Sequence, residues 1–202
     1  MNDSTVSPNV TDREGCDLNP RQGVVVVVAP TDADLVVRAG LGDLNAFDLL
    51  VARYRPRSLR FAVHFLGTRE DAEEAVQDAF LRAFRSLRSA DPNRFGAYLY
   101  RILLNRCRTM ARRRIWWRRK ADPIEDAIEL GVPHPSGAAD IREEIDRALA
   151  RIGPDYREAF LLKHVDDMSY EEMHQITGKS IPALKMRVSR ACESLRRILE
   201  TS

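Results

Sequence analysis

The sequence predicts an all-α protein in which two helical domains are joined by a flexible linker. Apolar residues recur at three- and four-residue steps through most of 31–120 and again through 140–199. No stretch alternates apolar and polar residues in the way that a half-buried strand does. Between the two blocks, residues 121–139 contain three prolines and two glycines, a composition typical of a linker. A chain of 202 residues, 44% hydrophobic and 31% charged, is long enough to bury one or two cores.

Residues 1–30 are predicted to form an N-terminal extension outside the fold. They contain three prolines and scattered polar residues. The valine run Val24–Val28 leaves open an edge strand or a partner-binding segment, but an unstructured leader is the preferred interpretation. No apolar run is long enough to span a membrane, and the first residues lack the pattern of a secretory signal. We therefore expect a cytoplasmic protein without membrane insertion.

The first domain, 31–120, is expected to be helical throughout. Its first long helix begins near Asp43, and Pro56 is expected to kink or restart it before Gly67 ends it. Thr68 is a predicted N-cap for the next helix, with Asp71 three residues later. The apolar face of these two helices is predicted to hold Leu44, Phe47, Leu50, Val51, Tyr54, Leu59, Ala62, Val63 and Leu66, then Ala72, Ala75, Val76, Ala79, Phe80, Ala83, Phe84 and Leu87. A loop at 89–93 precedes a third helix from about Phe95.

The second domain, 140–199, shows the same periodicity in shorter segments. The first segment carries the stripe Ile141, Ile145, Leu149 and Ile152, and Pro154 suits the first turn of a helix that runs to about Val165. Ser169 and Glu172 then have the spacing of a capping box. Gly178 is expected to end that short helix, and Ser180 to cap a last helix that runs to about Leu199.

The charges are strongly segregated, although the formal net charge is only +2. Residues 70–78 contain five acids and no bases, and residues 101–120 contain nine bases and no acids. Residues 122–129 contain four acids and no bases, and residues 179–197 contain six bases against one acid. This pattern favours a nucleic-acid binder that presents an acidic face to another partner. Any one block taken alone is equally compatible with a solvated helix face.

Common enzyme and metal-site patterns are missing from the sequence. The cysteines are far apart and odd in number, which fits reduced thiols better than disulfides or a zinc site. The histidines have no metal-ligand spacing, and no Gly-rich phosphate loop or G-x-S-x-G motif occurs. We expect no catalytic residues, no metal and no cofactor.

Residues 169–197 have the proportions of a DNA-reading helix-turn-helix: a capped helix, a glycine turn and a basic helix. At 3.6 residues per turn, Ile181, Leu184, Val188, Ala191 and Leu195 point inward on the last helix. Its outward face is predicted to hold Ala183, Met186, Ser189, Arg190 and Arg197, with Lys185 and Arg187 at the borders. The alternative is a helical hairpin with a solvated basic face. A second basic segment, 106–120, surrounds Trp116-Trp117, which either stack on bases or cap the core.

Several motifs, in the same order over 33–199, resemble bacterial RNA polymerase sigma factors of the extracytoplasmic-function (ECF) group of the sigma-70 family. The segments Gly42-Asp43, Ala46-Phe47, 53–56 and Leu66-Gly67 resemble region 2.1 and its junction, and 71–80 (DAEEAVQDAF) resembles region 2.2. The residues Tyr98–Ile102, Asn105 and Arg112–Arg114 are similar to regions 2.3 and 2.4. In the second domain, Leu161-Leu162, 168–173, Gly178, Ser180 and 184–191 resemble region 4.

The resemblance implies a region 2 helical bundle at 31–120 and a region 4 helix-turn-helix at 140–199. As partners it implies core RNA polymerase, through the beta-prime clamp helices and the beta flap, together with promoter DNA and an anti-sigma factor. The polymerase-binding residues would be Glu74, Gln77, Asp78, Leu81 and Arg82. Recognition and melting of the minus-ten element would use Asn93, Arg94, Tyr98, Arg101, Asn105, Arg108, Arg112 and Arg113, with an unstacked base held near 89–94. The minus-thirty-five element would be read by Ser180, Ala183, Lys185, Met186, Arg187, Ser189 and Arg190.

Three residues depart from the family pattern. Tyr98 stands where tryptophan is common, His174 where a small alanine lets the two helices approach, and Met186 where serine is frequent. His174 therefore puts the spacing of the helix-turn-helix in doubt. The main alternative function is a stand-alone helix-turn-helix regulator, which leaves the acidic face at 70–82 unexplained. A helical adaptor protein is a further alternative, which the two basic blocks disfavour. A nuclease is another, which is disfavoured because the acidic residues have no histidine partner to complete a metal site.

Overall fold

The computed structural model describes residues 29–120 and 137–200, with side chains at 29–114 and 144–200. In these ranges the chain forms helices and turns without a strand, so the all-α prediction is confirmed. The predicted N-terminal extension and linker lie almost wholly outside the described residues, and so do the side chains of Trp116 and Trp117.

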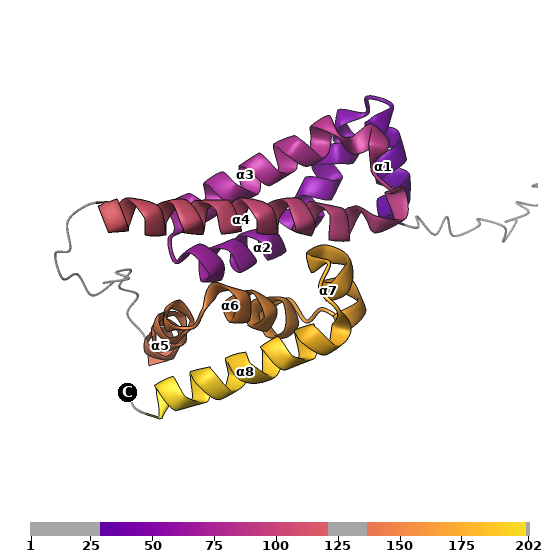
Figure 1. Cartoon of the computed structure of the whole chain (residues 1–202). Coiled ribbons are helices and arrows are strands. Elements are labelled where there is room, and N and C mark those ends of the chain that lie inside the picture. The colour runs from indigo at the N-terminus through magenta and orange to yellow at the C-terminus, as the bar shows by residue number, and fades with distance from the viewer. Residues whose placement is uncertain (1–28, 121–136, 201–202) are drawn as a thin grey trace, which may run out of the picture.

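The first domain is a bundle of three long helices with a short helix at one end (Figure 1). Its elements are α1 (Asp32–Gly40), α2 (Leu44–Leu66), α3 (Arg69–Arg85), the 3-10 turns η1 (Leu87–Ser89) and η2 (Pro92–Arg94), and α4 (Phe95–Lys120). The core joins aromatic side chains of α2 and α4: Phe61 stacks on Phe65 and meets the edge of Tyr100. Small alanines of α3, all buried, let this helix lie close to its neighbours.

Side-chain N-caps accept hydrogen bonds from the first backbone N–H groups of the helices in this domain. Asp43 accepts from the backbone N–H of Ala46, and Thr68 accepts from that of Asp71, which confirms the predicted N-cap at Thr68. The sequence reading gave no cap for α1, where Thr31 and Asp34 form a reciprocal capping box. Gly67, with φ of 84°, ends α2 in the left-handed conformation that suits glycine.

The helix does not restart at Pro56, because α2 is one continuous α-helix from Leu44 to Leu66 with Pro56 inside it. A proline inside a helix removes the hydrogen bond to the carbonyl four residues earlier, here that of Ala52. Both Pro56 and Ala52 are exposed, so water can satisfy that carbonyl.

Three predicted core residues are in fact exposed. Leu44 is 63% exposed, while Phe84 and Ile145 are each 39% exposed. Leu44 occupies the first residue of α2, and Phe84 lies in the last turn of α3, where fewer neighbours cover a helix. The periodicity gives the correct face, but it does not show where the neighbouring helix stops.

The second domain consists of α5 (Gly137–Arg151), α6 (Pro154–Phe160), the π-helical turn η3 (Leu161–Val165), α7 (Tyr170–Thr177) and α8 (Ile181–Leu199). The capping box predicted at Ser169 and Glu172 is present, and Gly178 ends α7 with φ of 70°. Ser180 is the N-cap residue of α8, but its side chain makes no capping hydrogen bond. Of the five predicted inward residues, Leu184, Val188, Ala191 and Leu195 are buried, and Ile181, the first residue of α8, is half-buried.

His174 does not separate the two helices, contrary to the doubt raised by the sequence. Its side chain is exposed, and its Nδ1 lies 2.7 Å from the carbonyl oxygen of Lys179. A carbonyl accepts, so Nδ1 carries the proton in this contact. The imidazole therefore stabilises the turn between α7 and α8 by a hydrogen bond to its backbone.

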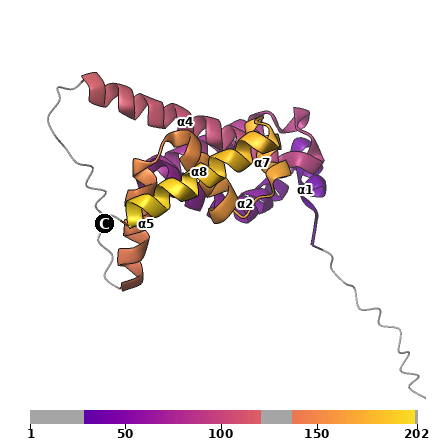
Figure 2. The same cartoon turned by 60° about the horizontal axis from the view of Figure 1, so that its bottom comes forward.

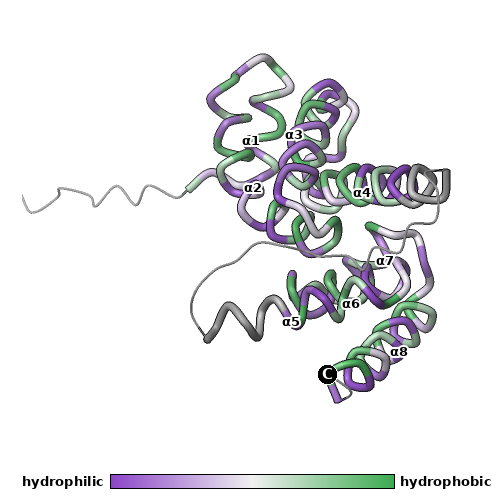
Figure 3. The backbone as a smooth tube through the Cα atoms, turned by 90° about the vertical axis from the view of Figure 1, so that its left-hand side faces the viewer, coloured by the Kyte–Doolittle hydropathy of each residue, from purple (hydrophilic) through white to green (hydrophobic). Residues whose placement is uncertain are grey.

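The two domains pack directly on each other. In Figure 1, α5, α6 and α7 lie below α2 and α4, with α8 on the side away from the first domain; in Figure 2, α8 comes to the front. Figure 3 shows the same division from the side, with α1 to α4 above α5 to α8. Along each helix in Figure 3, hydrophobic and hydrophilic residues alternate at short intervals, as expected for helices with one buried face.

We predict that Gly96→Ala destabilises the first domain. A Cβ at Gly96 would lie 2.9 Å from the hydroxyl of Tyr54, whose ring is held by Phe95 and by a hydrogen bond to Asp32. Overpacking of this kind should lower the free energy of unfolding by about 1 kcal/mol, measured by thermal unfolding. Gly40→Ala is the matched control, because its nearest neighbour is 4.0 Å away and helix propensity then favours alanine. Equal stability of the two variants would contradict this packing.

We predict that Ser169→Ala loosens α7 whereas Ser180→Ala does not. Only Ser169 accepts a hydrogen bond as a cap, so its loss should cost about 1 kcal/mol and speed amide exchange in α7 about fivefold. The backbone N–H of Ser169 also lowers the pKa of Glu172, so this contribution is present at neutral pH. It should disappear as the pH falls through the lowered pKa. Hydrogen exchange followed at several pH values tests both statements, and equal protection in the two variants would refute the first.

Candidate nucleic-acid and polymerase interfaces

The predicted polymerase-binding residues lie together on the solvent side of α3. Glu74, Gln77, Leu81 and Arg82 are exposed and Asp78 is half-buried, so the rotation derived from the sequence is correct. Arg106 of α4 donates to Glu74 at 2.7 Å and lies 3.2 Å from Asp78. Arg82 also contacts Asp78, at 3.0 Å. The arginines hold the carboxylates in fixed positions and leave Leu81 as the apolar centre of the surface.

An apolar extension of this surface was missed by the sequence analysis. The ring of Phe84 packs on that of Phe47 with centroids 4.8 Å apart, yet remains partly exposed. Leu44, one turn before Phe47 on α2, is exposed as well. The acidic α3 surface therefore passes into an apolar patch where α2 begins and α3 ends. The periodicity places Leu44 and Phe84 in the core, and only the structure shows that both side chains are exposed.

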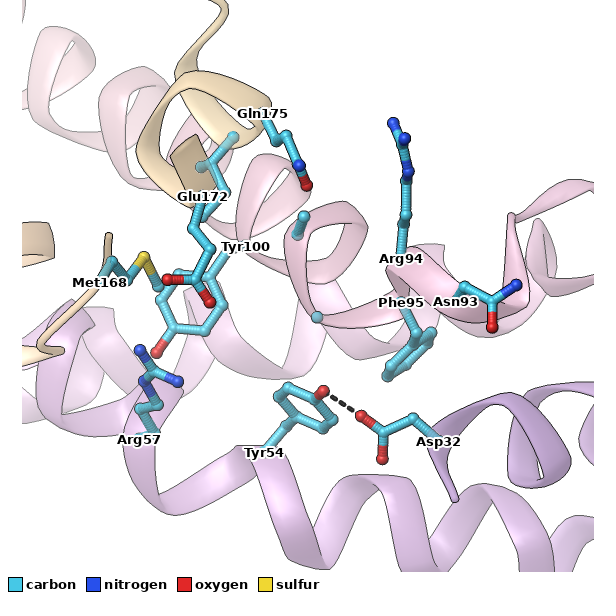
Figure 4. Close-up of a pocket in the computed structure, with 13 residues that line it drawn as sticks. Asp32, Tyr54, Arg57, Asn93, Arg94, Phe95, Tyr100, Met168, Glu172 and Gln175 are labelled. Carbon is cyan, nitrogen blue, oxygen red and sulfur yellow. Dashed lines mark hydrogen bonds between the residues drawn. The ribbon is translucent and has the colours of Figure 1, made fainter. Parts of the chain in front are cut away.

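A pocket of about 220 Å³ lies beside the start of α4, between the two domains (Figure 4). Its first-domain wall includes Asn93, Arg94, Phe95 and Tyr54, and α7 closes it with Glu172 and Gln175. Of the predicted minus-ten residues, the structure brings only Asn93 and Arg94 to this pocket. Both are exposed, and Arg94 extends away from the ring of Phe95 in Figure 4.

Tyr54 gives this pocket a fixed aromatic wall. Its hydroxyl donates to Asp32, and its ring meets the edge of Phe95 at a centroid distance of 5.5 Å. Burial, together with the hydrogen bond to Asp32, raises the pKa of the Tyr54 hydroxyl well above its ordinary value. The phenol is therefore neutral over the whole physiological pH range.

The remaining minus-ten residues are distributed along α4. Asn105, Arg112 and Arg113 are exposed. Tyr98 is half-buried, and its hydroxyl is hydrogen-bonded to Ser86 at the end of α3 rather than directed at the pocket. Tyr98 and Asn105 were predicted to lie close to the base-holding pocket, but neither residue lines it.

Arg101 and Arg108 of α4 are engaged by the second domain. Arg108 donates through two nitrogens to the two carboxylate oxygens of Glu158, at 2.8 and 2.7 Å. Glu158 is buried, and burial raises the pKa of its carboxyl despite the lowering effect of Arg108. Arg101 donates to the backbone carbonyl of Gln175 in α7. Two residues predicted to touch DNA therefore serve as contacts between the domains.

Asp166, directly after η3, is the second buried acid of this interface. Its side chain is completely buried, and Oδ1 lies 3.6 Å from Nε of Arg57 and 3.5 Å from Arg60. Neither carboxylate oxygen of Asp166 nor the nearby Tyr100 hydroxyl makes a hydrogen bond of acceptable geometry. Burial therefore raises the pKa of Asp166, although both arginines act to lower it. The two arginines compensate the charge of the Asp166 carboxylate from 3.6 and 3.5 Å, but its oxygens accept no hydrogen bond.

Arginines also bond to the carbonyls at helix ends. Arg157 of α6 donates to the carbonyl of Phe65 at 3.0 Å, and Arg114 of α4 donates to that of Leu66 at 2.8 Å. Burial, with a contribution from Arg114, lowers the pKa of Arg157 to about 10, which leaves it charged at neutral pH. Arg57 and Arg60 donate in turn to the carbonyls of Asp166 and Val165 at the end of η3.

The predicted readout surface of α8 is largely free of the first domain. Ser180, Lys185, Met186, Ser189 and Arg190 are exposed, and Ala183 and Arg187 are half-buried. Arg187 pairs with Asp155 at 3.0 Å, Arg190 donates to the hydroxyl of Tyr156 at 3.4 Å, and Lys185 lies over the ring of Tyr170. These contacts come from within the second domain and orient the cations along one side of α8.

Among the described residues, no helix is long and apolar enough to cross a membrane. In the same part of the chain, no three His, Cys, Asp or Glu side chains gather in a way that could hold a metal ion.

Comparison with known proteins divides the chain in the same way as the structure. Residues 50–118 match the family model for sigma-70 region 2, and residues 142–195 match the model for sigma-70 region 4. The chain is 30% identical over 179 residues to the ECF RNA polymerase sigma-E factor of Escherichia coli, covering 82% of this chain and 92% of that protein. It is 30% identical over 157 residues to the ECF sigma factor SigE of Mycolicibacterium smegmatis, covering 76% of this chain but only 61% of that relative.

Two solved structures share the fold. CnrH in complex with the cytosolic domain of CnrY superposes with a TM-score of 0.68 at 27% identity, covering 85% of this chain and 98% of that chain. The sigma factor RpoE of Bartonella quintana, in complex with the anti-sigma factor NepR, gives a TM-score of 0.65 at 27% identity, covering 76% and 96%. Two sigma-70 regions in the correct order, together with sequence identity over nearly the whole of a known member, show that this chain belongs to the ECF group of the sigma-70 family of RNA polymerase sigma factors.

Proposed function

We propose that this chain binds core RNA polymerase through α3 and directs it to promoters by contacting the minus-ten element with α4 and the minus-thirty-five element with α8. The observation that carries the proposal is the presence of three separate surfaces of suitable chemistry, each on a different helix, in one sigma factor chain. Bond formation would belong to the polymerase, so this protein would carry out no chemistry of its own.

The α3 surface suits a basic partner with an apolar centre. Glu74 and Asp78 are fixed by Arg106, so the surface loses little side-chain freedom when it is covered. Leu81 and the neighbouring Phe84 supply apolar area. The beta-prime clamp helices of the polymerase are the partner that family membership suggests, and charge complementarity would fix the orientation of the complex.

The start of α4 and its basic face suit a melted strand. Opening a base pair costs a few kcal/mol, which stacking on aromatic rings and contacts to phosphates can offset. Asn93 and Arg94 beside the half-buried ring of Tyr54 provide such a place, and Arg112 and Arg113 lie exposed further along α4. We assign the base-holding role to this pocket once α7 has moved away from it.

The exposed side of α8 suits the major groove. Arg190 can pair with a guanine edge, Lys185 with phosphate or guanine, and the small Ser189 allows close approach. The beta flap would hold the region 4 domain at the required distance. An anti-sigma factor is a further expected partner, since the solved relatives were crystallised with CnrY and NepR.

Leu81→Ala is predicted to weaken binding to core polymerase roughly tenfold, because it removes the apolar centre of the α3 surface. Leu49→Ala is the matched control: Leu49 is 48% exposed and Leu81 47% exposed, but Leu49 lies on α2 away from this surface. Affinity is measured by co-elution and by competition with a housekeeping sigma factor, without DNA. Equal affinity of the two variants would move the docking surface elsewhere. A folded protein that never binds polymerase would instead favour a stand-alone helix-turn-helix regulator.

Arg190→Ala is predicted to reduce discrimination between promoter sequences by about 1–3 kcal/mol if Arg190 reads a base edge. The control is Arg196→Ala, since Arg196 is equally exposed but lies in the last turn of α8. Holoenzyme binding to a library of minus-thirty-five variants measures the discrimination. A uniform loss on all sequences would show a phosphate contact at Arg190 rather than base readout.

A further inference from the structure

Met186 is an exposed apolar side chain on the predicted readout surface of α8. It is 47% exposed, and among the described residues it belongs neither to the buried core nor to the apolar side chains packed on that core. Along α8, which is described over its whole length, the other large apolar side chain that is exposed is Leu199, the last residue. A single exposed apolar residue is ordinary on a protein surface, so its meaning depends on the groups around it.

The polar side chains next to Met186 are held by partners within the second domain. Four of them have such a contact: Arg187 with Asp155 at 3.0 Å, Arg190 with the hydroxyl of Tyr156 at 3.4 Å, Ser189 with Glu193 at 3.3 Å, and Lys185 with the ring of Tyr170 at 5.6 Å. These contacts orient the polar groups before any ligand arrives. Met186 is the residue among them that remains open to an apolar partner.

The position of Met186 along α8 is one from which a side chain can reach a base. The second helix of a helix-turn-helix contacts base edges with its N-terminal residues, and Met186 is the sixth residue of α8. Residues three apart lie on one face of a helix, so Ala183 and Ser189 are its neighbours there. Both side chains are small and leave the helix free to approach the floor of the groove.

We propose that Met186 selects a thymine at one position of the minus-thirty-five element by contact with its C5 methyl group. Among the unmodified bases, this methyl is the apolar group of the major groove, and the other groups there are hydrogen-bond donors or acceptors. A thioether is at most a weak acceptor, so Met186 gains little from those polar groups. Against the methyl, both apolar surfaces leave water. The inference rests on the proposed function, which places α8 in the major groove.

The spacing on α8 also gives the expected position of this thymine. Met186 and Arg190 are four residues apart, which is about 6 Å along the helix axis. Stacked base pairs are about 3.4 Å apart. For a helix that lies along the groove, the selected thymine is therefore about two base pairs from the base that faces Arg190.

The test removes the methyl group from the DNA and the thioether from the protein. Holoenzyme made with the full chain first selects its preferred minus-thirty-five element from a randomised library. Each thymine of that element, on either strand, is then replaced in turn by deoxyuridine, which pairs identically and lacks only the methyl. Replacement at one position should lower the affinity about fourfold, the fold-change that corresponds to burial of one such group. That position should lie about two base pairs from the one at which Arg190→Ala relaxes discrimination.

Three variants assign the effect to the side chain. Met186→Ser should bind the thymine and deoxyuridine sites equally, whereas Met186→Leu should keep the difference because leucine is also apolar. Leu199→Ser is the matched control, since it removes a 38% exposed apolar residue from the same helix and should leave the ratio of the two affinities unchanged. The ratio is compared because a uniform change in polymerase or phosphate contacts cancels in it. Circular dichroism verifies that the helix content of each variant is unchanged.

Three results would overturn the inference. They are equal affinity for thymine and deoxyuridine at every position, a selected element without thymine, and a methyl effect that persists in Met186→Ser, which would assign the methyl to another side chain. Failure of the proposed function has a different signature. A chain that does not bind core polymerase, or a holoenzyme that enriches no minus-thirty-five element, would fail at the selection step and would overturn both.

Discussion

The bonding of arginine side chains to carbonyls at helix ends is the interaction on which the arrangement of this protein depends. The last carbonyls of a helix have no partner within the helix, and burying them unpaired is costly. Helix α2 ends where both domains meet, and Arg114 from α4 and Arg157 from α6 donate to its last carbonyls. Arg57 and Arg60 do the same for η3 in the other direction. Each domain therefore completes the helix ends of the other, and the direction in which region 4 faces follows from this exchange.

The helical architecture could be predicted from the sequence because it rests on local signals. The capping box at Ser169, the cap at Thr68, the glycine at Gly178 and the apolar face of α8 are all confirmed. A restart of the helix at Pro56 was wrongly expected, because sequence alone does not show that Pro56 and Ala52 lie at an exposed position where the unpaired carbonyl can be tolerated. Leu44, Phe84 and Ile145 were wrongly placed in the core, since periodicity identifies a face but not the length over which a neighbour covers it.

The docking of the two domains could not be predicted, and the reason is physical. Several of its bonds join side chains to backbone carbonyls, across as many as 109 residues for Arg57 and Asp166. Every residue has a backbone carbonyl, so the sequence does not mark the ones that accept these bonds. Arg101 and Arg108 were assigned to DNA from the family pattern, which does not reveal that a second partner within the chain can use them. The outward positions on α3 and α8 followed from helix rotation, whereas the minus-ten residues of α4 came from the family resemblance. The roles of all of them remain predictions.

The use of carbonyls as acceptors bears on the construction of hybrid sigma factors. Every helix has a C-terminal carbonyl, so a foreign region 4 of the same fold would offer the region 2 arginines many of the same acceptors. Three positions would still matter, because Glu158 and Asp166 are buried acids at this contact and Asp146 of α5 lies 2.6 Å from Nδ1 of His64. A transplanted domain with different residues at these positions would leave the region 2 arginines without their acidic partners. Exchange of the region 4 domain would then alter the contact between the two domains as well as the exposed face of α8.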